Sequence, residues 1–219
     1  MREFIPVLTK CALFEGIDQD DVSAMLGCLR ARTLRVKKNQ PIFAEGDDAR
    51  YVGIVLRGSA LVVKEDYYGN RSIMARAEPA ELFAESFACA GVSRLPISVI
   101  AEQDSEVMLI DSHCITVSCG NACSFHSRMI YNLLKVVATK NLQFNQKIEI
   151  TARRTTREKL MAYLMSQAKA QGSNTFTIPF DRQALADYLG VERSAMSAQI
   201  SKLREDGVID CHKSKFTLL

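Results

Sequence analysis

The sequence predicts an α+β chain in which a β-barrel is followed by one long helix and a compact, mostly helical domain. Short apolar runs separated by glycine-containing turns occupy residues 33–111, which is typical of short strands. Residues 124–150 carry a heptad-like apolar seam, and two closely spaced amphipathic helices precede the C-terminus. The length of 219 residues suits one large domain or two small ones, and 47% hydrophobic with 24% charged residues excludes a disordered chain.

Charge and cysteine usage limit the partners and the compartment. The net charge is +3, and the excess of basic residues lies in residues 150–219, which favours a polyanion as the partner of that part. No apolar run approaches the roughly 18 residues of a membrane span, so no membrane partner is expected. The N-terminus lacks the apolar core of a signal peptide, and the seven scattered cysteines do not resemble a secreted disulfide framework. A cytoplasmic protein is expected.

Residues 1–120 are expected to form a β-barrel with short leading helices. Asp20 and Asp21 precede a helically spaced apolar run, as acidic residues do in the first turn of a helix. From residue 33 onward the apolar runs are short, and turn signals such as Arg57-Gly58-Ser59 separate them. Short strands at this spacing predict a barrel of the jelly-roll type.

Residues 121–150 are expected to form a single long dimerisation helix. Apolar positions recur there at alternating spacings of four and three, the pattern of a coiled-coil seam. The seam consists of Ile130, Leu134, Val137, Asn141, Phe144 and Ile148. A neighbouring apolar row, which is expected to pack on the barrel, consists of Met129, Leu133 and Val136. The polar Asn141 favours pairing with a second copy in fixed register, and an amphipathic helix buried in its own domain is the alternative.

Residues 151–219 are expected to form a winged helix-turn-helix domain. Ala186 is small where two helices must cross closely, and Gly190 stands where the turn needs a positive φ. A buried stripe on the second helix is predicted for Val191, Met196, Ile200 and Leu203. The opposite face, which suits base edges and phosphates in a major groove, carries Arg193, Ser194, Ser197, Ser201 and Lys202. A helical hairpin with a solvated face is the alternative.

Over nearly its whole length the chain resembles the CRP/FNR superfamily of bacterial transcription regulators. The resemblance rests on the barrel segment Ile42–Gly58 (IFAEGDDARYVGIVLRG), on the place of the long helix and on the terminal helix-turn-helix. It implies a homodimer that binds double-stranded DNA with one recognition helix per half-site, the half-sites lying about 34 Å apart. It also implies phosphate contacts from the start of the first helix and from the wing. These positions hold Arg182, Gln183, His212, Lys213 and Lys215.

Within the recognition helix the resemblance is partial. Family members commonly place a Glu just after the first Arg of this helix and another Arg four residues beyond that Glu. Here Ser194 and Ala198 occupy these two positions, while Arg193 remains a candidate for guanine. The usual operator of the family is therefore not expected.

The resemblance also implies an effector pocket in the barrel, where a Glu accepts from a ribose hydroxyl and an Arg pairs with a cyclic phosphate. The corresponding positions are Ala84, Glu85, Ser86, Arg94, Leu95 and Pro96, with Leu142 and Gln143 at the long-helix positions that often contact a purine. Leu95 stands where the family has the arginine that pairs with the cyclic phosphate, here called the cassette arginine. Its absence removes a charge-assisted bond worth roughly 1.5–3 kcal/mol. Cyclic AMP is therefore not the expected ligand, unless Arg94 acts one position away. A satisfied structural carboxylate is the alternative role of Glu85.

Three cysteines and a histidine, Cys114, Cys119, Cys123 and His126, lie between the last strand and the long helix. With a helix start near residue 121, Cys123 and His126 would lie one turn apart. Thiolates and imidazole at this density are able to bind zinc or iron or to form a redox pair, so a metal or redox site is one hypothesis. Packing of small thiols at the barrel–helix junction is the alternative, and the cofactor stays unidentified.

These features predict a sequence-specific DNA-binding transcription regulator. A small effector, or a redox or metal change at the barrel–helix junction, would control it, and an activator of this kind would also contact RNA polymerase. A cyclic-nucleotide-binding-like module that acts through protein partners is the alternative. Three histidines, no glycine-rich phosphate loop and no Ser-His-Asp arrangement argue against an enzyme.

Overall fold

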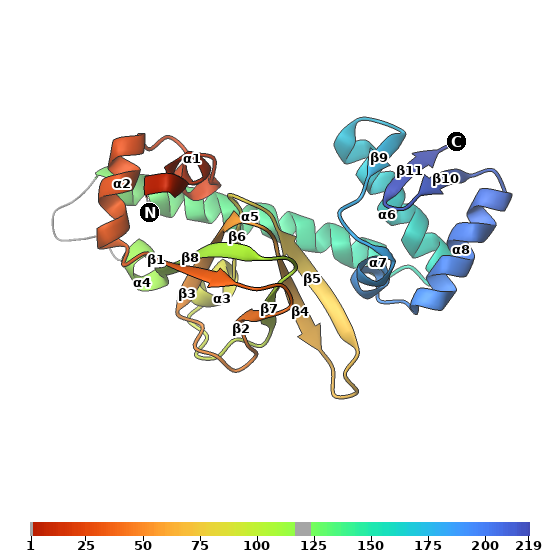
Figure 1. Cartoon of the computed structure of the whole chain (residues 1–219), viewed down its shortest axis with the longest axis horizontal. Coiled ribbons are helices and arrows are strands. Elements are labelled where there is room, and N and C mark those ends of the chain that lie inside the picture. The colour runs from red at the N-terminus through yellow and green to blue at the C-terminus, as the bar shows by residue number, and fades with distance from the viewer. Residues whose placement is uncertain (1, 117–123) are drawn as a thin grey trace. The chain divides into compact units, whose positions relative to one another are not determined.

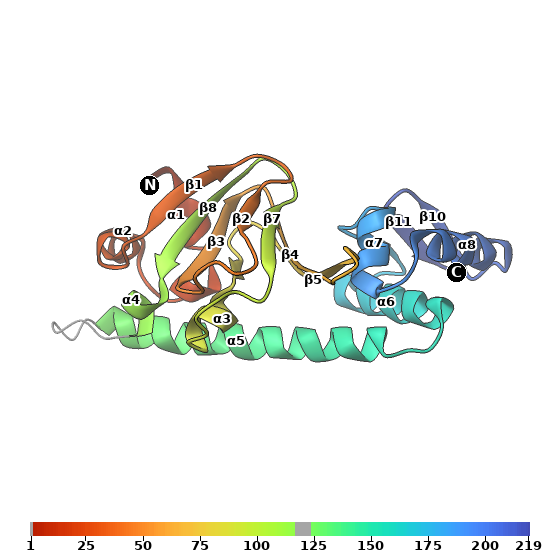
Figure 2. The same cartoon turned by 90° about the horizontal axis from the view of Figure 1, so that it is seen from below.

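The computed structural model describes residues 2–116 and 124–219 (Figures 1 and 2). The chain divides into two compact units, Met1–Asn141 and Leu142–Leu219, and the long helix contributes to both. The N-terminal unit is mostly β-structure and the C-terminal unit mostly helical, which confirms the predicted α+β class. Among the described helices, none combines the length and the apolar character that crossing a membrane requires.

Short helices precede the barrel. They are η1 (Arg2–Phe4), α1 (Ile5–Leu8), η2 (Ala12–Phe14) and α2 (Gln19–Cys28). In α2 the predicted acidic residues Asp20 and Asp21 lie in the first turn, where they interact favourably with the positive end of the helix dipole. Val22, Met25 and Leu26 are buried on the inner face of the same helix.

The barrel consists of two four-stranded antiparallel sheets. Its strands are β1 (Arg32–Val36), β2 (Pro41–Phe43), β3 (Tyr51–Arg57), β4 (Ala60–Glu65), β5 (Arg71–Ala77), β6 (Leu82–Phe83), β7 (Ser98–Ala101) and β8 (Ser105–Asp111). One sheet has the order β1-β8-β3-β6 and the other β2-β7-β4-β5, and the apolar core between them contains side chains from both. This arrangement confirms the predicted jelly-roll-type barrel.

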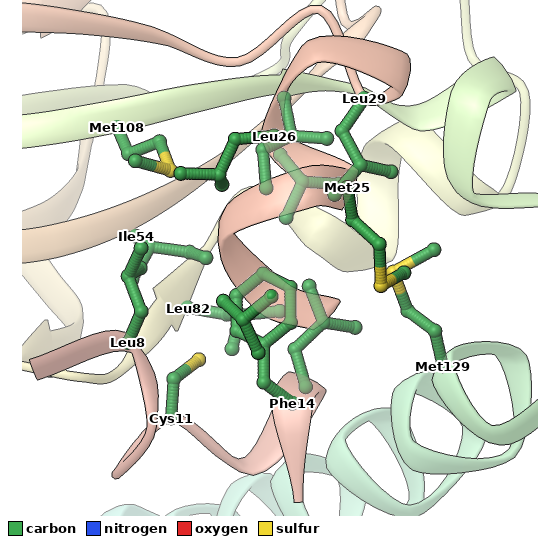
Figure 3. Packing of buried hydrophobic residues seen from close by; sticks show 14 of the residues in the cluster. Leu8, Cys11, Phe14, Met25, Leu26, Leu29, Ile54, Leu82, Met108 and Met129 are labelled. Atoms are coloured by element: carbon green, nitrogen blue, oxygen red, sulfur yellow. The ribbon is translucent and has the colours of Figure 1, made fainter. Parts of the chain in front are cut away.

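The first sheet is covered on both faces, which explains why β3 is apolar along nearly its whole length. Val52, Ile54 and Leu56 alternate onto the face that packs against the leading helices, whereas Val55 points into the barrel interior. The side chains on the outer face of this sheet form a second apolar core with the leading helices and the long helix, which we call the outer core. Figure 3 shows this outer core, where Ile54 and Met108 of the sheet meet side chains of the leading helices and Met129.

Helix α3 (Glu85–Cys89) follows β6, whereas α4 (Ser112–Thr116) and the predicted long helix α5 (Ser124–Thr151) follow β8. Met129, Leu133 and Val136 are buried in the outer core, as predicted for this row. In Figure 3 the side chains of Met25 and Met129 point toward each other. Asn132 adds polar contacts, since its Nδ2 donates to the carbonyls of Leu13 at 3.0 Å and Glu15 at 2.8 Å.

The C-terminal unit contains one leading helix, a helix-turn-helix and a small three-stranded sheet. Its elements are α6 (Thr156–Gln171), β9 (Thr175–Thr177), α7 (Arg182–Leu189), α8 (Arg193–Glu205), β10 (Ile209–His212) and β11 (Lys215–Leu218). Thr155 and Glu158 form a capping box that fixes the start of α6. The small sheet has the order β10-β11-β9, and Phe176 and Phe216 stack between neighbouring strands at 6.4 Å.

Gly53 of β3 is required by a close approach inside the barrel. A Cβ at this position would lie 2.0 Å from Cζ of Phe83, whose side chain is fully buried. We predict that Gly53→Ala lowers the free energy of unfolding by about 1–3 kcal/mol because of this overpacking. Urea unfolding measures the change.

Gly27 provides the matched control, because it lies in α2 and a Cβ there meets no atom within 4 Å. Gly27→Ala should raise stability by up to about 1 kcal/mol, since alanine loses less backbone entropy in a helix. Equal stability of the Gly53→Ala variant and the wild type would contradict this packing of the barrel.

Candidate nucleic-acid interface and barrel site

The helix-turn-helix is built by a cap, a turn and a close crossing. Asp181 caps α7, its Oδ1 accepting from the backbone N–H of Ala184 at 2.8 Å. Gly190 ends α7 with φ 61°, a left-handed conformation that glycine adopts without strain. Ala186 is fully buried where α7 meets α8, as predicted for a small residue at the crossing.

The recognition helix α8 has one buried and one exposed face. Met196, Ile200 and Leu203 are buried as predicted, whereas Val191 precedes the helix and is only half-buried, because it lies in the turn. On the other face Ser197 is half-buried, and the exposed side chains are Arg193, Ser194, Ser201 and Lys202. A row of cationic and hydroxyl groups on a helix with a packed back matches what major-groove contacts require.

The two residues that open α7 have partners within their own domain. The Arg182 guanidinium lies 5.0 Å from the centre of the Phe216 ring, and its Nη2 donates to Sγ of Cys211 at 3.4 Å. Gln183 donates to Oδ1 of Asp187 at 2.7 Å. Arg182 thus joins α7 to the wing, and its phosphate contact remains a prediction, as does that of Gln183.

The wing presents basic side chains at its tip. His212 ends β10, Lys215 begins β11, and Lys213 lies in the turn between them with φ 52°. All of these side chains are exposed, so the predicted contacts to phosphate are sterically open.

In the barrel, Glu85 is buried and paired with the long helix. Ala84 precedes it with φ 61°, a left-handed conformation, and Glu85 is then the first residue of α3. Glu85 is 2% exposed, and both of its carboxylate oxygens lie 3.0 Å from Nζ of Lys140. Nζ of Lys140 also donates to the carbonyl of Leu82.

Lys140 was not among the residues predicted from the sequence, although a signal for it exists. Met129, Leu133 and Val136 follow the four-three spacing of a buried helix row, and the next step of four reaches Lys140. A lysine that continues an apolar row indicates a buried acidic partner.

Among the other residues of the predicted effector pocket, Ser86 contacts Glu85, whereas Leu95 and Arg94 lie elsewhere. Ser86 Oγ donates to Oε1 of Glu85 at 3.4 Å, and Ala84 and Leu95 belong to the apolar barrel core. Arg94 is exposed, and its Nη1 donates to the carbonyl of Gly46 at 3.2 Å. Arg94 thus binds the carbonyl of Gly46, whereas Lys140 is the cation that pairs with the Glu85 carboxylate.

Arg94 instead lines a different cavity of about 490 Å³ at the surface of the barrel. Arg32 and Tyr51 share this lining, with the Arg32 guanidinium 4.5 Å from the centre of the Tyr51 ring. On the long helix, Leu142 is 71% exposed and Gln143 is exposed as well.

Two family descriptions match the chain. Residues 158–219 match the Crp-like helix-turn-helix domain, and residues 33–116 match the cyclic nucleotide-binding domain. The chain belongs to the CRP/FNR family. This is a family of transcription regulators and not of enzymes, which confirms that expectation from the sequence.

Similar proteins extend this result. The transcriptional activator protein FnrL of Cereibacter sphaeroides is 36% identical over 69 residues, a match that covers 27% of this chain and 28% of that protein. FixK2 from Bradyrhizobium japonicum is 20% identical with a TM-score of 0.67, covering 86% of this chain and 92% of that one. The c-di-GMP responsive regulator CLP from Xanthomonas campestris is 16% identical with a TM-score of 0.75, covering 92% and 99%. At these identities the two solved structures show a shared fold.

The cysteine hypothesis of this CRP/FNR chain stays a prediction, because Cys119 and Cys123 lie outside the described residues. His126 is 6% exposed, and its Nε2 lies 3.2 Å from the carbonyl of Cys114. In residues 2–116 and 124–219, no group of three His, Cys, Asp or Glu side chains is placed to hold a metal. Cys114 packs against the outer core, which agrees with the packing alternative for this residue.

An aromatic cluster that the sequence reasoning missed connects the end of α5 to the helix-turn-helix. Tyr188 of α7 lies 5.0 Å from Phe180 and 5.4 Å from Tyr163, measured between ring centres. Nζ of Lys147 lies 4.5 Å from the centre of the Tyr188 ring. Burial lowers the pKa of Lys147 to about 8 and raises that of Tyr188.

The lowered pKa of Lys147 predicts a pH dependence of stability. Its ordinary value is 10.5, so between about 8 and 10.5 the unfolded chain binds more protons than the folded one, and this group's contribution to stability rises with pH. The Lys147→Met variant lacks this titrating ammonium. We expect the wild type to gain stability relative to Lys147→Met between about pH 7 and pH 9.5 in urea unfolding. A difference that stays constant over this range would contradict the burial of the ammonium.

Proposed function

We propose that this chain is a homodimeric, sequence-specific regulator that reads the major groove with α8. The observation that carries the proposal is the division of α8 into a packed face and an exposed face with Arg193 and Lys202. The matches to the Crp-like helix-turn-helix and to the cyclic nucleotide-binding domain support it. RNA polymerase is the expected further partner if the regulator activates transcription.

The proposed dimer pairs through α5. Leu134 is 65% and Ile148 62% exposed in the single chain, and Ile130 is also exposed. These side chains share the four-three seam with Asn141, which is exposed too. A second copy of the same seam would bury the row, while the barrel takes up the neighbouring row of Met129 and Leu133.

Regulation is proposed to enter at the junction between the barrel and α5. A small effector or a redox change there would shift the relative placement of the two recognition helices, by its differential affinity for two dimer arrangements. Cyclic AMP is not the proposed effector, because Leu95 replaces the cassette arginine and lies in the apolar core. The carboxylate of Glu85 is already paired with Lys140.

Arg193 tests the DNA-reading face. With a duplex selected from a random library, Arg193→Ala should bind about 5- to 150-fold more weakly and lose preference at one base pair of each half-site. Lys169→Ala is the matched control, because Lys169 is also an exposed cation but lies in the last turn of α6. Fluorescence anisotropy at several salt concentrations measures both. Wild-type affinity that does not depend on salt would contradict DNA binding, because phosphate contacts release counterions.

Leu134 tests the dimer. Leu134→Glu places a charge in the seam and should convert the dimer to a monomer in sedimentation velocity, since an unpaired charge opposes burial. Met165→Glu is the control, because Met165 is 59% exposed but lies on α6, away from the seam. A wild type that sediments as a monomer at micromolar concentration would exclude the proposed pairing.

A further inference from the structure

Glu85 lies at a junction of three elements. Figure 2 shows α3 directly beside α5, and the contacts of Lys140 connect the two helices in detail. Nζ of Lys140 binds the carboxylate of Glu85 at the start of α3 and the carbonyl of Leu82 in β6. One side chain of the long helix therefore binds both β6 and α3, the helix that follows this strand.

Because the Lys140–Glu85 ion pair is largely buried, each of its two charges depends on the other. The Glu85 side chain is 3% exposed and that of Lys140 24%, so water compensates little for the loss of either charge. Among the described residues, Lys140 is the basic group within 4 Å of Glu85. Removing one member of a buried pair leaves the other charge uncompensated, whereas removing both is often nearly neutral.

The same helix carries an exposed pair for comparison. Lys135 and Glu15 lie 2.7 Å apart, with side chains that are 49% and 60% exposed. An exposed pair of this kind contributes little, because solvent screens it. Within one helix, the buried pair and the exposed pair therefore predict different consequences of the same substitution.

We propose that the ammonium of Lys140 is the resident counter-charge of the barrel site, so that the junction holds its arrangement without a bound cyclic nucleotide. Lys140 is a positioning residue in this proposal: it fixes α5 against α3 and β6, and DNA affinity is independent of cyclic nucleotides. A ribose hydroxyl that bonded to Glu85 would compete with Lys140 for the carboxylate, and a displaced ammonium would exchange a charged partner for the neutral carbonyl of Leu82. The proposal rests on the proposed DNA-binding function for its second readout only.

The test compares Lys140→Met, Glu85→Gln and the double variant with the wild type. The first readout is amide hydrogen exchange of residues 82–89 in the full chain without DNA. The second is the affinity for the selected duplex. Each single variant should exchange faster in this segment and bind DNA about tenfold more weakly, because about a tenth of the molecules keep the competent junction. The double variant should recover most of both losses.

Two controls separate this role from a general loss of folding. Lys135→Met should match the wild type in both readouts. Lys140→Arg keeps the charge and should retain most of the protection of residues 82–89. If Lys140→Met fails to fold, the double variant and Lys140→Arg still decide the question, since both are expected to fold.

Several outcomes would overturn the proposal. Lys140→Met could match the wild type in hydrogen exchange, or the double variant could lose as much as the two single variants together. Cyclic AMP or cyclic GMP at millimolar concentration could raise the melting temperature of the wild type or tighten its DNA binding. A wild type that binds no duplex would instead overturn the proposed function, and the exchange of residues 82–89 would still test the junction.

Discussion

The packing of α5 on the barrel is the interaction on which the N-terminal unit depends. Met129, Leu133 and Val136 enter the core that covers the outer face of the first sheet, and Lys140 ends the same row with an ion pair to Glu85. The apolar contacts stabilise the packing of α5 but are not directional. The ion pair fixes one position of the helix, because a buried carboxylate needs its partner. Both parts together set where the long helix lies on the barrel.

The same helix connects this packing to the proposed function. One side of α5 faces the barrel, while Leu134 and Ile148 on another side stay exposed in the single chain. A helix that is fixed by its own barrel is able to present this exposed seam in a defined orientation to a second copy. Near its end, Lys147 meets the aromatic cluster of the helix-turn-helix through Tyr188. The long helix thus has contacts both with the barrel and with α7 of the helix-turn-helix.

Much of this fold could be predicted from the sequence, because periodicity reports burial. The short strands, the buried row of α5 and the turn at Gly190 follow from spacing and from the conformational needs of single residues. The barrel site was harder to predict. Leu95 departs from the family's nucleotide site while Glu85 is retained, and the partner of Glu85 is 55 positions away and belongs to another element. Pairings of this kind depend on tertiary placement, as does the stacking of Arg182 on Phe216.

A crystal structure of the chain with a selected duplex, grown without added nucleotide, tests the central claim most directly. The account predicts two copies paired along α5, an α8 helix of each copy in the major groove, and Nζ of Lys140 within hydrogen-bonding distance of the Glu85 carboxylate. A co-purified small molecule on Glu85, with Lys140 displaced toward solvent, would contradict it.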